Sequence, residues 1–233
     1  MMKFRIINVI TFAIALMATV VAISVFPDVV PIHFNAQGIA DGWGSKYTLL
    51  VTPIIILAMQ AFGEVMVRIF KKQIEDATDE KTVAETQANL KLMPIVFTVV
   101  SAVFALLNFG FLYMTYAQLD APTATEFDII KYVVAIMGLS FLILGNYMPK
   151  SRKNSTMGLR CKWSMYNDAT WQKSNRLGGI AFMMLGIASV IFALACEGTM
   201  AVIYMLAALV WVSIISLIYA YSVYKQEVQK EQK

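Results

Sequence analysis

Six long apolar runs divide the chain, and its charged residues gather between them. Each run has about 20 residues, the length that a helix needs to cross a hydrocarbon core of roughly 30 Å. The runs lack the alternation of apolar and polar residues typical of a membrane β-barrel, so their backbone hydrogen bonds are expected to be helical. The pattern predicts an all-α, polytopic membrane protein with six transmembrane helices at residues 6–26, 48–70, 92–116, 129–148, 177–196 and 200–223.

The composition agrees with this prediction and excludes other classes of protein. Of the 233 residues, 59% are apolar and 15% are charged, whereas soluble domains carry about 25% charged residues. A soluble globular enzyme is therefore excluded. Two cysteines cannot form a disulfide framework, and a single histidine leaves little room for a His-rich metal site. We expect no cofactor and no bound metal.

Six spans place the termini and connections alternately on the two sides of the membrane. The basic residues lie mainly on one of these sides. Of the 19 Lys and Arg residues, all but Lys46 and Lys131 fall at the termini or around the second and fourth connections. The side rich in Lys and Arg is cytoplasmic, so both termini are predicted to lie inside the cell. This topology accounts for the net charge of +4, and no direct contact with nucleic acid is expected.

The connections divide the chain into three predicted parts. Residues 1–70 form an N-terminal two-helix unit with an outward-facing loop. Residues 71–91 contain no Gly or Pro, so they are expected to continue the flanking helices into the cytoplasm as a helical hairpin. Residues 92–233 form a four-helix C-terminal unit, which carries a basic cytoplasmic loop at 145–178.

The outward-facing loop combines turn residues, aromatic residues and charges. Pro27 ends the first helix because it lacks an N–H group, and the segments 35–38 and 41–44 have turn chemistry. Such a loop is either a structured interfacial connector or a surface that recognises a peptide or a lipid head group. A metal at His33 is disfavoured, since the nearby aspartates lack a regular ligand spacing.

The cytoplasmic loop carries seven basic residues and one acidic residue. Trp163 and Trp171 are eight residues apart, so a short helix along the membrane interface would place both on one face, with Lys and Arg at the head groups. Topology alone explains the charge. It does not explain the polar and glycine positions among the charges, which favour a specific role for this loop.

Polar residues within the spans indicate helix packing rather than catalysis or ion transport. Glu64 is one turn from Arg68, and this pair is expected to neutralise the carboxylate. Asn8, Gln60 and Asn108 are expected to form hydrogen bonds between helices. The sequence has no nucleophile–base motif and no phosphate-binding Gly loop. The chain is therefore not predicted to be an enzyme or an ion-coupled pump.

The two loops share an order of residues, Pro27, Asn35, Gly38 and Trp43 in one, and Pro149, Asn154, Gly158 and Trp163 in the other. Two inverted three-helix halves would produce such a repeat, as in transporters, although the spacings differ. A small transporter or lipid-handling protein is therefore an alternative hypothesis.

The outer segment reads PDVVPIHFNAQGIADGWGSK, and the inner one contains GNYMPKSRKNSTMGLRCKW followed by a second Trp. Together they resemble the Sdp immunity (SdpI-type) family of integral membrane proteins, which carry P-x-x-P-x-H-[FW]-[ND] and G-N-x-x-x-K-x-x-x-N-x-x-x-G-[IL]-R-x-x-W. Cys161, Lys162 and Asn175 depart from the family pattern.

The resemblance implies a protein of the bacterial plasma membrane that gives immunity to a secreted peptide toxin. It also implies capture of a small cytoplasmic repressor at the membrane, so the expected partners are membrane lipids, toxin and repressor. The implied toxin-binding residues are Asp28, Pro31, His33, Asn35, Gly38, Asp41, Trp43 and Lys46. The implied signature or partner-binding residues are Asn146, Lys150, Asn154, Gly158, Arg160, Trp163, Trp171 and Asn175.

Overall fold

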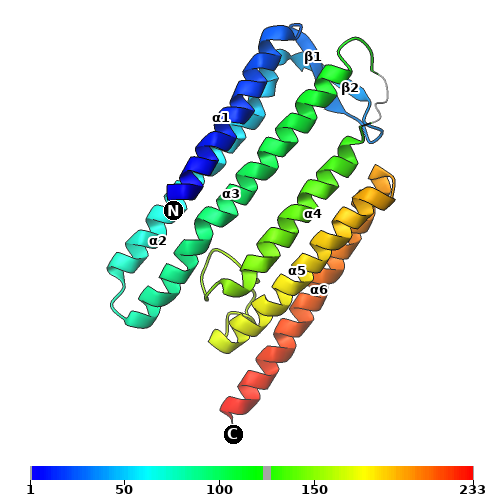
Figure 1. Cartoon of the computed structure of the whole chain (residues 1–233). Helices are drawn as coiled ribbons and strands as arrows, with labels where there is room; N and C mark the ends of the chain where they lie inside the picture. The colour runs from blue at the N-terminus through cyan, green and yellow to red at the C-terminus, as the bar shows by residue number, and fades with distance from the viewer. Residues whose placement is uncertain (1, 123–126, 233) are drawn as a thin grey trace.

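The computed structural model describes residues 2–122 and 127–232, and six of the helices in these residues are long and apolar enough to cross a membrane (Figure 1). The predicted fold class is therefore confirmed. The helices are α1 (Met2–Val25), α2 (Val51–Asp76), α3 (Glu80–Ala117), α4 (Ile129–Tyr147), α5 (Asp168–Ala195) and α6 (Gly198–Glu231).

The connection after α1 contains the only strands among the described residues. β1 (Val29–Phe34) and β2 (Ala40–Ser45) pair antiparallel, and the short helix η1 (Lys46–Leu50) leads into α2. A second short helix, η2 (Met148–Lys150), follows α4. The turn residues of the sequence correctly indicated an ordered segment after α1. They did not reveal the strands, because β1 contains a proline and β2 contains two glycines, which usually argue against a strand.

Four helices, α2, α3, α5 and α6, continue well beyond the apolar runs. α2 ends at Asp76 and α3 begins at Glu80, so only residues 77–79 separate them. Asp79 caps α3 by accepting a hydrogen bond from the backbone N–H of Thr82 at 2.8 Å. Bonds from Thr82 lower the pKa of the Asp79 carboxyl, because they favour its charged form.

α3 is the central helix of the molecule. It packs against α1 and α2 on one side and against α4 on the other, while α4, α5 and α6 pack together as a second group (Figure 1). Since α3 is also among the longest helices, with 38 residues, it connects the two ends of the molecule.

α4 and α5 approach each other through facing glycines. A β-carbon placed at Gly186 would lie 2.5 Å from the carbonyl oxygen of Gly138, and one at Gly179 would lie 2.6 Å from that of Gly145. The backbones are therefore in direct contact. Small residues at a helix interface allow this close van der Waals packing in a membrane, where the hydrophobic effect does not drive helices together.

Polar side chains bridge the first three helices. The Gln60 side chain donates to the Asn8 carbonyl at 2.8 Å, and the buried Asn108 amide donates to the Thr19 hydroxyl at 3.2 Å. These contacts confirm the predicted interhelical role of Gln60 and Asn108.

The predicted neutralisation of Glu64 by Arg68 is wrong. The Glu64 carboxylate instead accepts two hydrogen bonds from the Arg5 guanidinium of α1. Arg68 carries the same guanidinium group, so the choice of partner depends on how α1 packs against α2, and Arg5 lies 59 residues away in the chain.

Candidate functional site

Two folded polar segments lie at opposite ends of the helices (Figure 1). We name them after the sides on which the charge distribution places them. The outer hairpin comprises residues 28–46, and the inner loop comprises residues 148–167.

The outer hairpin is fastened to the C-terminal end of α3. The fully buried Gln118 accepts a hydrogen bond from the Ala40 N–H at 2.7 Å and donates one to the Gly38 carbonyl at 2.8 Å. The Thr115 hydroxyl donates to the Pro31 carbonyl at 3.1 Å. These bonds position the hairpin on α3. Gln118 was missed at the sequence level, because a single Gln after an apolar run looks like an ordinary helix end.

Four of the eight predicted toxin-binding residues hold the hairpin together. The Asn35 side chain accepts hydrogen bonds from two backbone N–H groups of the turn, and Gly38 adopts a φ of 72°, which glycine favours. Pro31 and Gly38 are buried. The largely covered Lys46 ammonium donates to the Phe26 carbonyl at 3.3 Å.

The other four predicted residues form the exposed surface of the hairpin. Trp43 is 43% exposed, although it lies in a strand. The exposed His33 and Asp41 side chains are joined at 2.5 Å, and the exposed Asp28 carboxylate is paired with Lys46 at 3.1 Å. Among the described residues, no group of three His, Cys, Asp or Glu side chains is placed to hold a metal ion. The surface is suited to binding through an indole ring and two carboxylates.

The predicted interfacial helix carrying Trp163 and Trp171 is wrong. The inner loop is irregular beyond η2, and α5 begins only at Asp168. Trp171 is 1% exposed, and its indole N–H donates to the Ser151 carbonyl at 3.0 Å. Trp163 packs on Tyr221 of α6, with ring centroids 5.1 Å apart. The eight-residue spacing was misleading because the two rings do not share one helix.

Three signature residues pack together, with two of them, Trp171 and Asn175, buried beneath the inner loop. The buried Asn175 amide accepts from the Leu159 N–H at 2.7 Å and donates to the Trp171 carbonyl at 3.0 Å. Gly158 has a φ of 100°, and a β-carbon there would lie 2.4 Å from the Asn175 amide oxygen. Gly158, Trp171 and Asn175 therefore determine the shape of the loop, and the two buried side chains among them are not available to a partner.

The remaining signature residues are placed at or near the surface. The Asn154 amide oxygen accepts from the Thr156 and Met157 N–H groups at 2.7 Å, which closes a turn. The exposed Arg160 guanidinium donates to the Ser155 carbonyl. Asn146 and Lys150 are also exposed. Of these residues, Lys150 and Arg160 offer positive charge to a partner.

The inner loop is bonded to α3 and α6. The buried Asn89 of α3 accepts a hydrogen bond from the Arg152 N–H at 2.9 Å, and beside the loop Lys81 of α3 pairs with Asp168, the first residue of α5, at 2.5 Å. The Tyr166 hydroxyl donates to Glu231 of α6 at 2.5 Å. This bond to a carboxylate raises the pKa of the Tyr166 hydroxyl, since it stabilises the protonated form.

Comparisons with known proteins match both segments. Residues 150–220 match the model of the SdpI/YfhL protein family, and residues 10–57 match a domain of unknown function (DUF1648). The chain is also similar to the immunity protein SdpI of Bacillus subtilis (strain 168), with 19% identity over 225 residues, which cover 97% of this chain and 98% of that protein. No solved structure matches the chain at a significant level.

Proposed function

We propose that this chain, a multi-pass bacterial membrane protein of the SdpI/YfhL protein family, is an immunity protein that protects its cell from a secreted peptide toxin and reports the toxin to a cytoplasmic partner. The similarity to a protein named for immunity extends over nearly the full length of both chains. That similarity supports the immunity part of the proposal, and the structure suggests how each end of the molecule contributes.

The outer hairpin is the proposed toxin-binding surface. Apolar side chains of a peptide pack on the exposed Trp43, and its basic groups reach the exposed carboxylates of Asp28 and Asp41. Buried tryptophans often carry much of the affinity of an interface, because they desolvate a large area at low cost in side-chain entropy.

One observation carries the proposal of signalling, namely that α3 is bonded to both polar segments. Gln118 holds the outer hairpin at one end, and Asn89 holds the inner loop at the other, where Lys81 also pairs with the first residue of α5. Toxin binding that shifts or rotates α3 therefore moves the backbone of the inner loop. The exposed cations of that loop, Lys150 and Arg160, then bind an acidic surface of a small repressor.

The first prediction concerns protection by the outer hairpin. Expressed in a toxin-sensitive Gram-positive host, the wild-type chain is expected to raise survival against an Sdp-type peptide. Trp43→Ala is expected to weaken toxin binding about 30-fold, as for loss of a central tryptophan, and to lower survival accordingly. Survival curves at matched membrane levels of protein provide the measurement.

Trp211→Ala is the matched control, because Trp211 is 65% exposed but lies on α6, away from the hairpin. It is expected to protect as the wild type does. Equal protection by Trp43→Ala and the wild type would remove the hairpin from the proposal. If the wild type gives no protection but drives solute or lipid flux in liposomes, the alternative of a transporter or lipid-handling protein is favoured.

The second prediction concerns recruitment by the inner loop. Arg160→Glu reverses a charge on the exposed face of the loop, so it is expected to abolish capture of the repressor at the membrane. Protection is expected to remain, since the substitution is remote from the hairpin. Membrane recruitment of a fluorescent repressor, recorded in the same cells as survival, separates the two effects.

Lys72→Glu serves as the control for charge reversal. Lys72 is exposed near the end of α2, outside the inner loop, so recruitment should persist in this variant. If both reversals abolish recruitment, the net charge of the cytoplasmic side attracts the repressor and the loop has no specific part.

A further inference from the structure

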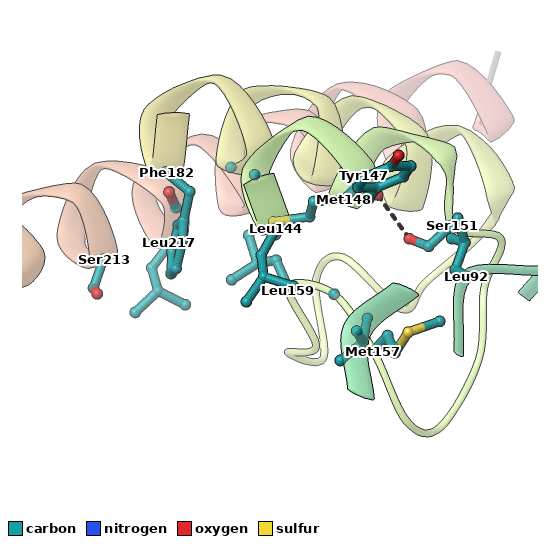
Figure 2. A pocket seen from close by; sticks show the side chains of 15 residues that line it. Leu92, Leu144, Tyr147, Met148, Ser151, Met157, Leu159, Phe182, Ser213 and Leu217 are labelled. Carbon is teal, nitrogen blue, oxygen red and sulfur yellow. Dashed lines mark hydrogen bonds between the residues drawn. The ribbon is translucent and has the colours of Figure 1, made fainter. Parts of the chain in front are cut away.

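A cavity of about 440 Å³ lies where α3, α4, α5 and α6 meet the inner loop. This volume falls within the range of about 300–1,000 Å³ typical of ligand sites. Figure 2 shows apolar side chains from several of these elements around one space. Its walls include Leu92, Leu144, Met148, Met157, Leu159 and Phe182. An apolar occupant suits such walls, since polar groups entering them would lose water without gaining partners.

The cavity is accessible from the face of α6 that is expected to contact lipid. Ser213 and Leu217 of α6 line the cavity and are also exposed, with Leu217 39% exposed. Leu92 of α3 lines the opposite wall. A flexible chain can therefore enter laterally from the bilayer between α3 and α6.

Two basic residues adjoin residues that line the cavity on its loop side. The Lys150 ammonium lies 4.3 Å from the ring centroid of Tyr147, which lines the cavity. Arg160 directly follows Leu159, another lining residue, and no Asp or Glu occurs between residues 145 and 167. The cations are therefore not neutralised within this segment, and they favour an anionic group nearby.

From these observations we infer that the cavity binds an acyl chain of an anionic phospholipid from the cytoplasmic leaflet. The chain lies between α3 and α6, and the phosphate is near Lys150 and Arg160. Apolar walls, lateral access and nearby basic residues all fit this one occupant. The inference does not depend on a role in toxin immunity.

Native mass spectrometry of the purified full chain tests this site, with phosphatidylglycerol and phosphatidylcholine of identical acyl chains as probes. One phosphatidylglycerol is expected to be retained about fivefold more strongly than phosphatidylcholine, because of the nearby basic residues. Ser213→Phe is expected to weaken retention about tenfold, since the ring displaces about two methylenes from the cavity. Lys150→Gln should reduce only the preference for the anionic lipid.

Ser222→Phe is the matched control. Ser222 is exposed on the same helix, nine residues from Ser213, which places it on the opposite face. It is expected to retain lipid as the wild type does. Equal retention by the two Phe variants would overturn the site, as would equal retention of both lipids by the wild type. Preferential retention of a free fatty acid would overturn the phospholipid assignment.

Discussion

Trp171→Ala is expected to lower the free energy of unfolding by about 3–5 kcal/mol, the usual cost of removing a buried aromatic side chain. Trp171 is 1% exposed and packs under the inner loop, where its indole N–H donates to the Ser151 carbonyl. Denaturant unfolding in mixed micelles would measure this change. Removing the ring also leaves the loop without its support, so trypsin should cleave at Lys153 and Arg160 faster than in the wild type.

Two further tryptophan variants separate the loss of stability caused by removing ring volume from the loss caused by removing the indole hydrogen bond. Trp211 is 65% exposed, so Trp211→Ala is expected to change stability by less than about 0.5 kcal/mol. Trp171→Phe retains most of the ring but leaves the Ser151 carbonyl without its donor, which should cost about 1–3 kcal/mol. Equal losses for Trp171→Ala and Trp211→Ala would show that the indole is not a structural anchor of the loop.

Gly186→Leu is expected to destabilise the α4–α5 pair by about 3 kcal/mol or more. A β-carbon at Gly186 would lie 2.5 Å from the Gly138 carbonyl oxygen and 2.6 Å from the Leu142 nitrogen. Both are backbone atoms, so no side-chain rotation relieves the clash and the helices must separate. Size-exclusion chromatography after a temperature series in detergent should report a lower midpoint of unfolding.

Ala207→Leu is the control for added bulk. Ala207 is exposed on α6, so a larger side chain there meets lipid and the midpoint should be close to that of the wild type. Gly186→Ala should already lower the midpoint, because the clash involves the β-carbon itself. If Gly186→Leu and Ala207→Leu unfold at the same temperature, close glycine packing is not what holds α4 against α5.

The sequence by itself determined the six spans and the two polar segments between them. A membrane span is identified by the length and apolar composition of consecutive residues. Its identification therefore does not depend on residues far away in the chain. Pro27 correctly placed the end of the first span for the same reason. The loop motifs likewise indicated the family resemblance, and the family matches at residues 10–57 and 150–220 confirm it.

Only the tertiary structure decided which polar groups bind one another. The sequence predicted that Glu64 pairs with Arg68, one helical turn away. In the structure its partner is Arg5, 59 residues away in the chain. The bonds from Gln118 to Ala40 and from Asn175 to Leu159 likewise join separate segments. A residue type and its spacing do not specify such partners, because the choice depends on how the helices pack.

The structure also separated supporting residues from exposed ones within each motif. The sequence placed Asn35 and Trp43 in one candidate surface, but the Asn35 side chain closes a turn while Trp43 faces outward. The glycines between α4 and α5 appeared only as part of apolar runs. Their role depends on a backbone contact so close that a β-carbon at Gly186 would lie 2.5 Å from the Gly138 carbonyl oxygen, and that contact exists only once the two helices are packed.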